Sequence, residues 1–257
     1  MRFVSKVSFL FVLIGFVSLA YAGRFYDAQL GRWVEVDPAD EFHSPYTYVK
    51  NNPLVFVDPN GEEVLIAISG IYQKNYSAIE IKDASSTTFQ IANELTDWAG
   101  KQGITDFDAL AIGGGWSDNS TIDMAVSFIK ENMSSGEQLI IYGYSWGGDT
   151  AVELTNRLGQ EGIDVSLLVT VDAAKGYLSG LVDKKIPKNV AENINYFQPK
   201  ASGIGSHGTA NVAASTSTKV LNIQFNYGGE TTHANIDEQL KPVVINAMQN
   251  TLDPSKD

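Results

Sequence analysis

Ser145 lies in a stretch whose residue types and spacing indicate covalent chemistry. Residues Gly143-Tyr144-Ser145-Trp146-Gly147 fit the pattern G-x-S-x-G. The apolar run 139–142 before them predicts a buried parallel strand, and residues 149–158 after them have helical spacing. Such a turn strains its serine, and the flanking glycines keep side chains out of the space where strand and helix close. The stretch therefore predicts a nucleophile elbow with Ser145 as the nucleophile.

A serine hydroxyl is a poor nucleophile unless a base lies within hydrogen-bond reach. Only His207 and His233 follow Ser145 in the sequence. His233 lies between the last apolar strand and the last predicted helix, which is the expected position of the base. His207 lies in a glycine-rich loop with no strand directly before it. We therefore predict His233 as the base and keep His207 as the alternative.

A carboxylate must orient that base, and three aspartates compete for this role. Asp172 directly follows the predicted strand 165–171, so its carboxylate points across the C-terminal edge of the sheet. Asp149 lies on the nucleophile helix, where it can simply interact with the positive helix end. Asp164 precedes its strand and so lies at the opposite edge. We therefore predict Asp172 as the acid.

An oxyanion hole needs two hydrogen-bond donors. The amide of Trp146, directly after the nucleophile, is one predicted donor. The other is expected from the loop after the first strand, at Gly70 or Ile71, and the sequence does not choose between them. The glycines 113–115 at the end of the second strand are the alternative.

The elements that must position these residues alternate along the chain. Strands and helices that alternate at this length predict an α/β fold, a mostly parallel sheet covered by helices on both faces, with the site at the C-terminal strand ends. We place this working domain at residues 62–257. The expected strands are 63–69, 109–112, 139–142, 165–171, 193–198 and 220–225, and the expected helices are 89–99, 122–133, 149–158 and 234–248.

Residues 1–22 have the pattern of a secretory signal. Arg2 and Lys6 precede an apolar run over residues 9–20, and Ala20-Tyr21-Ala22 forms a small-residue cleavage site. The apolar run is short for a membrane span. We therefore expect cleavage after Ala22 and export of the protein to the periplasm or the medium, with an uncleaved anchor as the alternative.

Residues 23–61 are rich in turns between short aromatic runs. Their motifs resemble the core segment of RHS repeat-associated proteins, which implies that the chain beyond Gly61 is the working effector domain. Glu62 stands where that family has a leucine. The matching residues are Gly23 to Trp33, Asp37-Pro38, Tyr46-Thr47-Tyr48, Asn51-Asn52-Pro53 and Asp58-Pro59-Asn60-Gly61.

The working domain resembles the α/β-hydrolase superfamily, in particular the lipase- or esterase-like domains that follow RHS cores. The resemblance rests on the Gly-Tyr-Ser-Trp-Gly-Gly turn, the strand ending in Val171-Asp172, the stretch 195–198 and the ending 232–237, and it covers most of residues 63–250. It implies an ester hydrolase that uses Ser145, Asp172 and His233. The loop after the first strand reads Ser-Gly-Ile where many relatives have His-Gly.

Charge and composition exclude several classes of function. The net charge of −12 argues against nucleic acid as a partner, and the absence of cysteine excludes a thiol nucleophile or a thiolate metal site. No clustered set of metal ligands is evident, so we expect neither a metal nor a cofactor. The partner candidates are a small-molecule or lipid ester substrate, a transient lipid contact and an immunity protein.

Three hypotheses follow from these residues. The first is a secreted serine hydrolase of carboxylic esters, such as a lipase, phospholipase or esterase, with Tyr72, Trp116 and Trp146 as candidate acyl-pocket residues. The second is an acyltransferase or peptidase on the same triad, since acyl transfer shares the first half-reaction. The third is a non-catalytic, RHS-derived binding module, which an intact Ser/Asp/His set disfavours.

Overall fold

The computed structural model describes residues 26–27, 32–33, 63–71, 78–104, 106–114, 118–133, 137–175, 183–198, 208–225 and 231–252. The chain divides into two compact units, Met1–Pro53 and Leu54–Asp257. In the first unit β1 (Tyr26–Asp27) pairs antiparallel with β2 (Arg32–Trp33). The predicted signal 1–22 and most of the RHS-like segment 23–61 lie outside the described residues.

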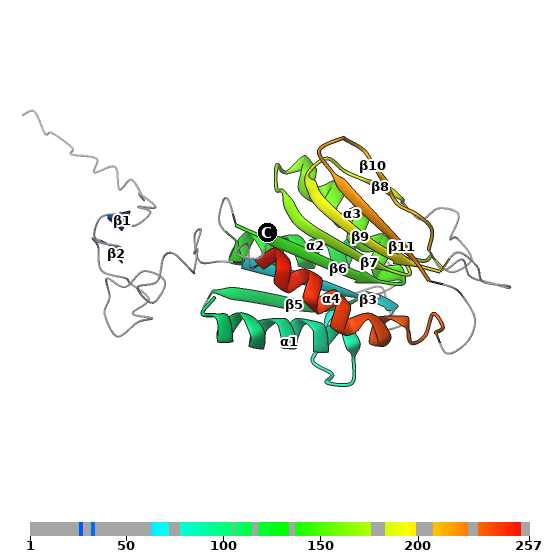
Figure 1. The fold of residues 1–257 in the computed structure, drawn as a ribbon, viewed down its shortest axis with the longest axis horizontal. Coiled ribbons are helices and arrows are strands. Elements are labelled where there is room, and N and C mark those ends of the chain that lie inside the picture. Colours follow the sequence, from blue (N-terminus) through cyan, green and yellow to red (C-terminus); the bar gives the residue numbers. More distant parts are fainter. Residues whose placement is uncertain are drawn as a thin grey trace, which may run out of the picture. The chain divides into compact units, whose positions relative to one another are not determined.

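The second unit is built on a sheet of seven strands in the order β11-β9-β7-β6-β3-β5-β4 (Figure 1). All neighbouring strands are parallel except β4, which runs antiparallel to β5 at the edge. In chain order the strands are β3 (Glu63–Ile71), β4 (Ile79–Glu80), β5 (Phe107–Gly114), β6 (Leu139–Tyr144), β7 (Val165–Val171), β9 (Val190–Phe197) and β11 (Lys219–Gln224).

Four helices cover the two faces of this sheet (Figure 1). Alternate residues of β3 separate into two apolar clusters, with Leu65 in one and Ile66 in the other. The cluster with Leu65 includes side chains of α1 (Thr87–Gln102) and α4 (Ile236–Leu252), so these two helices lie on one face of the sheet. The cluster with Ile66 includes side chains of α2 (Asp118–Asn132) and α3 (Trp146–Gln160), which lie on the other face. The prediction of an α/β fold with a mostly parallel sheet and helices on both faces is confirmed.

The helix α3 packs unusually close to the centre of the sheet because two glycines have no side chain there. A Cβ atom on Gly143 would lie 2.3 Å from the carbonyl oxygen of Gly147. One on Gly147 would lie 2.3 Å from the carbonyl oxygen of Ser69 and 2.4 Å from that of Ile68. Since these neighbours are backbone atoms, they cannot rotate away, and a larger residue would push α3 off the end of β3.

Each main strand and helix expected from the sequence is present, with ends shifted by a few residues. Five short strands were not expected: β1 and β2 in the first unit, and β4, β8 (Lys185–Ile186) and β10 (Val212–Ala213) in the second. β8 and β10 pair with each other in a separate two-stranded sheet. None of the helices in the described ranges is long and apolar enough to span a bilayer.

Replacing Gly147 with alanine is expected to lower the free energy of unfolding by about 1–3 kcal/mol, because the new methyl group overlaps two carbonyl oxygens of β3. Urea unfolding followed by circular dichroism measures the change. Gly100→Ala is the matched control: no atom lies within 4 Å of a Cβ there, so we expect stabilisation of about 0.5–1 kcal/mol. Equal unfolding midpoints for the two variants would contradict the packing described above.

Candidate active site

Ser145 occupies the sharp turn between β6 and α3. Its φ of 57° and ψ of −123° lie in a region that side-chain-bearing residues rarely adopt, at a cost of about 1–3 kcal/mol. Backbone hydrogen bonds hold the turn: the Ser145 amide donates to the carbonyl of Val171 at 2.9 Å, and the amides of Gly148 and Ala174 donate to the Ser145 carbonyl at 3.0 Å. The strained backbone is therefore fixed by β7, by the segment that follows β7 and by the helix α3.

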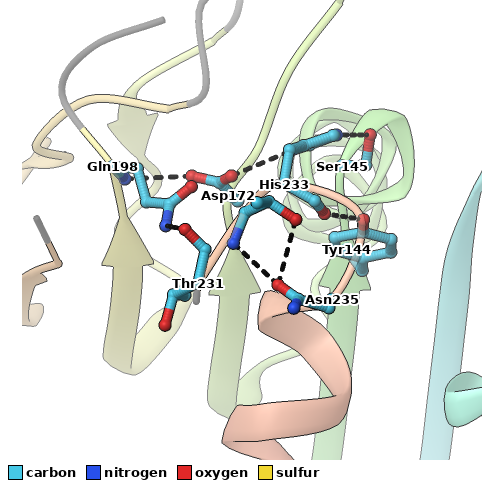
Figure 2. Close-up of polar contacts among 8 residues, drawn as sticks. Tyr144, Ser145, Asp172, Gln198, Thr231, His233 and Asn235 are labelled. Carbon is cyan, nitrogen blue, oxygen red and sulfur yellow. Dashed lines mark hydrogen bonds and ion pairs between the residues drawn. The ribbon is translucent and has the colours of Figure 1, made fainter. Parts of the chain in front are cut away.

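His233 approaches Ser145 from the turn that leads into α4. Its Nε2 lies 2.8 Å from the Ser145 Oγ, although 88 positions separate the residues. The His233 side chain is 26% exposed, so a molecule in solvent can reach it. The turn is closed locally by Asn235, whose side-chain oxygen accepts hydrogen bonds from the amide of Thr232 at 2.7 Å and from its hydroxyl at 3.1 Å (Figure 2).

Asp172 completes the line of contacts on the far side of the imidazole (Figure 2). Its Oδ2 lies 2.7 Å from the Nδ1 of His233, and its Oδ1 accepts a hydrogen bond from the amide of Gln198 at 2.9 Å. The residue is fully buried and has a φ of 48°. Because a buried carboxylate accepts the Nδ1 proton, a neutral His233 has a bare Nε2 facing the serine.

The structure thus brings together the three side chains that the sequence singles out as Ser145, Asp172 and His233. The alternative base, His207, lies outside the described residues. Asp164 stands just before β7, at the edge of the sheet opposite to Asp172. The strand, the tight turn and the helix around the serine have the local structure of a nucleophile elbow, as the sequence predicts.

Asp149, the competing carboxylate, is fully buried but serves a different contact. It pairs with the ammonium of Lys175, three residues after Asp172, and its Oδ1 accepts from the amide of Asp183 at 2.9 Å. Lys175 also pairs with Glu153 at 2.8 Å. Burial lowers the pKa of Lys175, but its bonds to these two carboxylates outweigh burial, so the pKa rises above its ordinary value. Asp149 therefore joins the start of α3 to the segment that follows Asp172.

The predicted oxyanion donors lie around the serine as follows. Trp146 is the first residue of α3. A Cβ on Gly70 would lie 3.4 Å from the Ser145 Oγ, so the backbone of β3 passes directly beside the nucleophile. The pairing of β3 with β5 shifts register between Ile68 and Ile71, which marks a bulge at this point. The alternative glycines 113 and 114 belong to β5, one strand farther from β6; residue 115 lies outside the described residues.

Sequence reasoning missed the residues that hold the base and the acid in place. Tyr144 donates a hydrogen bond from its hydroxyl to the backbone carbonyl of His233, and its ring centroid lies 5.4 Å from that of the imidazole. Burial, then the charges of Asp237 and Asp172, raise the pKa of the Tyr144 hydroxyl, so it stays protonated and remains a donor. The x positions of G-x-S-x-G carry no signal for this contact, which joins segments 89 positions apart.

The arrangement can move a proton from the serine hydroxyl to the imidazole while the buried carboxylate stabilises the imidazolium. Within the described ranges, no group of three or more histidine, aspartate or glutamate side chains could hold a metal ion. The candidate acyl-pocket residues Tyr72 and Trp116 lie outside the described residues, and Trp146 is partly buried.

Replacing Tyr144 with phenylalanine should loosen the turn that carries His233, because the backbone carbonyl of His233 loses its donor. We expect a loss of about 1–2 kcal/mol in the free energy of unfolding. Faster amide hydrogen exchange should accompany it in residues 232–235. Mass-spectrometric hydrogen exchange on the purified protein measures the local effect.

Tyr142→Phe is the matched control on the same strand. The Tyr142 hydroxyl is fully buried, and no hydrogen-bond partner for it exists within the described part of the chain. Its removal should therefore leave the stability unchanged or raise it. If amide hydrogen exchange in residues 232–235 were as slow in Tyr144→Phe as in Tyr142→Phe, the anchoring role of the Tyr144 hydroxyl would be refuted.

No family model matches the chain. Over 42 residues it is 40% identical to salivary gland surface protein 1 of Aedes aegypti, and this match spans 16% of the chain and 1% of that protein. Among solved structures, it is similar to a putative hydrolase of Agrobacterium vitis (13% identity, 74% of this chain and 88% of that one, TM-score 0.48). It is also similar to the type II thioesterase of the borrelidin biosynthetic cluster (10%, 76% and 94%, TM-score 0.44) and a cutinase-like protein of Cryptococcus (15%, 75% and 95%, TM-score 0.40).

Proposed function

We propose that this chain is a serine hydrolase that cleaves carboxylic esters through a covalent acyl-enzyme. The observation that carries the proposal is the unbroken line from the Ser145 Oγ through the imidazole of His233 to the buried Asp172, with contacts of 2.8 and 2.7 Å. Both distances are those of real hydrogen bonds. A chance meeting of three residues from three loops is a poor explanation for this geometry.

In the first half-reaction the Ser145 oxygen attacks the acyl carbon of the ester, and its proton passes to the Nε2 of His233. The bond from the acyl carbon to the alcohol oxygen then breaks, and His233 returns the proton to the leaving alcohol. In the second half-reaction a water molecule takes the place of the alcohol, frees the acid and regenerates the serine.

The oxyanion formed at each stage needs donors on the side of Ser145 away from His233. The amide of Trp146 and an amide of the bulged segment of β3, at Gly70 or Ile71, are the proposed donors. Their support is the position of Trp146 at the start of α3 and the close approach of Gly70 to the serine. Donors of this kind supply about 3–4 kcal/mol each to the stabilisation of the transition state.

Export of the enzyme remains part of the proposal and rests on the sequence of residues 1–22 alone. Two further parts of the proposal also rest on sequence alone. They are the origin of residues 23–61 in an RHS-like core and an immunity protein as a partner. The net charge of −12 supports a substrate that is neutral or positively charged rather than an anionic polymer.

The first test is covalent labelling by a fluorophosphonate probe. We expect stoichiometric labelling of the purified protein at Ser145, detected by mass spectrometry, and none in Ser145→Ala. Turnover of p-nitrophenyl esters should disappear in the same variant. Labelling without ester turnover would favour an acyltransferase or a peptidase, and absence of labelling would favour a non-catalytic module.

Asp172→Asn provides an independent test of the acid. An amide in this position accepts the Nδ1 proton poorly and favours the wrong tautomer of the imidazole, so kcat on p-nitrophenyl acetate should fall about a thousandfold or more. The matched control is Asp164→Asn, at the opposite edge of the sheet, which should keep full activity. A small loss in Asp172→Asn, comparable to that of the control, would remove Asp172 from the mechanism.

A further inference from the structure

A cavity of about 390 Å³ opens beside the proposed nucleophile, and several hydroxyl-bearing and acidic residues are among those that line it. Ser69 and Gly70, at the end of β3, form part of its wall, and Gly70 is also in contact with Ser145. Tyr144 and Ala234, the neighbours of Ser145 and His233 in the chain, line it as well. The cavity therefore adjoins the position where an ester bound to Ser145 would lie.

The remaining walls come from the first turns of α1 and α4 and the segment before α1. On the α1 side the lining includes Thr87 and Thr88, which carry hydroxyl groups. Three acidic residues, Asp83, Asp237 and Glu238, also line the cavity. No lysine or arginine is among the described residues that line it.

The nearest basic side chains of these segments are paired elsewhere. Lys82 forms an ion pair with Glu80 at 3.2 Å, and Lys241, on α4, forms one with Glu94 at 2.6 Å. Lys82 and Lys241 therefore each have an acidic partner that is not among the residues lining the cavity. Glu238 is exposed and forms no ion pair among the described residues, so its charge is available to a bound molecule.

Asp237 has a partly structural role, which limits its use in a test. It accepts hydrogen bonds from the hydroxyl of Thr87 and from backbone amides of the first turn of α4, and burial raises its pKa. The neighbouring hydroxyl of Tyr142 is fully buried without a partner in the described ranges, and the charge of Asp237 contributes to raising its pKa. Glu238 is the better position for substitution, since its carboxylate is solvated.

A cationic group gains from the surrounding carboxylates and keeps hydrogen-bond partners. We propose that this cavity binds a positively charged group of the ester substrate, so that the enzyme prefers cationic esters over neutral esters of the same shape. The inference rests on the proposed function, because it assigns a substrate class to the same serine.

The cation could belong to the alcohol or to the acyl part of the ester, and two matched pairs of substrates separate these cases. The first pair is acetylcholine, which is the acetate ester of choline, and the acetate ester of 3,3-dimethylbutanol, in which carbon replaces the quaternary nitrogen. The second pair is the p-nitrophenyl ester of trimethylammoniobutyrate and its carbon isostere. Within each pair the shape is the same and only the charge differs, so the ratio of kcat/KM values reports charge recognition.

We expect the wild-type enzyme to prefer the cationic member of one pair by about fivefold or more at low salt, and the pair that shows this identifies the cationic part. The ratio should fall as salt is added, since ions screen an exposed charge. Glu238→Gln should lower the ratio, and Glu238→Lys should bring it below one. Glu131→Gln, an exposed carboxylate on α2 at the other face of the sheet, should leave the ratio unchanged.

Two outcomes would overturn the inference while the hydrolase proposal stands. One is fluorophosphonate labelling of Ser145 together with equal rates within both pairs. The other is a cation preference that is the same in wild type, Glu238→Gln and Glu238→Lys. Failure of Ser145 to react with the probe at all would instead refute the proposed function, and the substrate class with it.

Discussion

The close approach of α3 to the end of β3 is the constraint on which the rest of the site depends. Gly147 lies against two carbonyl groups of β3, and Gly143 lies against the carbonyl of Gly147. This contact leaves room for the left-handed backbone of Ser145, whose cost is met by hydrogen bonds to the neighbouring β7 segment. It also brings Gly70 beside the serine oxygen, so one packing contact positions both the nucleophile and a proposed oxyanion donor.

Asp172 and His233, the other two members of the proposed triad, are also positioned by contacts with the turn at Ser145. Tyr144 precedes the serine and binds the backbone of His233, while the Ser145 carbonyl accepts from Ala174, two residues after Asp172. Gly148 allows Ala173 to pack closely on α3. The proposed acid, base and nucleophile are therefore fixed relative to one turn, which is what a proton relay over two short hydrogen bonds requires.

Residues 208–218, on the β9–β11 side of the sheet, contain no helix. A network of polar side chains lies there instead. Asn195 bonds the side chains of Thr170 and Asn222, and Asn211 bonds that of Asn193, all within 3.0 Å. Buried amides of this kind are stable only when their partners are present. The network secures β9, the strand whose end donates to Asp172 through Gln198.

The sequence by itself determined the order of strands and helices, because buried parallel strands and amphipathic helices leave strong local patterns. It also determined the elbow, since G-x-S-x-G between strand and helix is a local motif. For the acid it favoured an aspartate at a strand end, and for the base a histidine just before the last helix. Contacts such as Tyr144 with His233 and Asn195 with Asn222 were decided only by the tertiary structure. These contacts join distant segments of the chain through single side chains. The spacing of apolar residues along the sequence does not indicate hydrogen bonds of that kind. The cavity beside Ser145 could likewise not be predicted from the sequence. Its acidic and hydroxyl-bearing residues come from the starts of α1 and α4, the segment before α1 and the end of β3, which meet only after the sheet has formed.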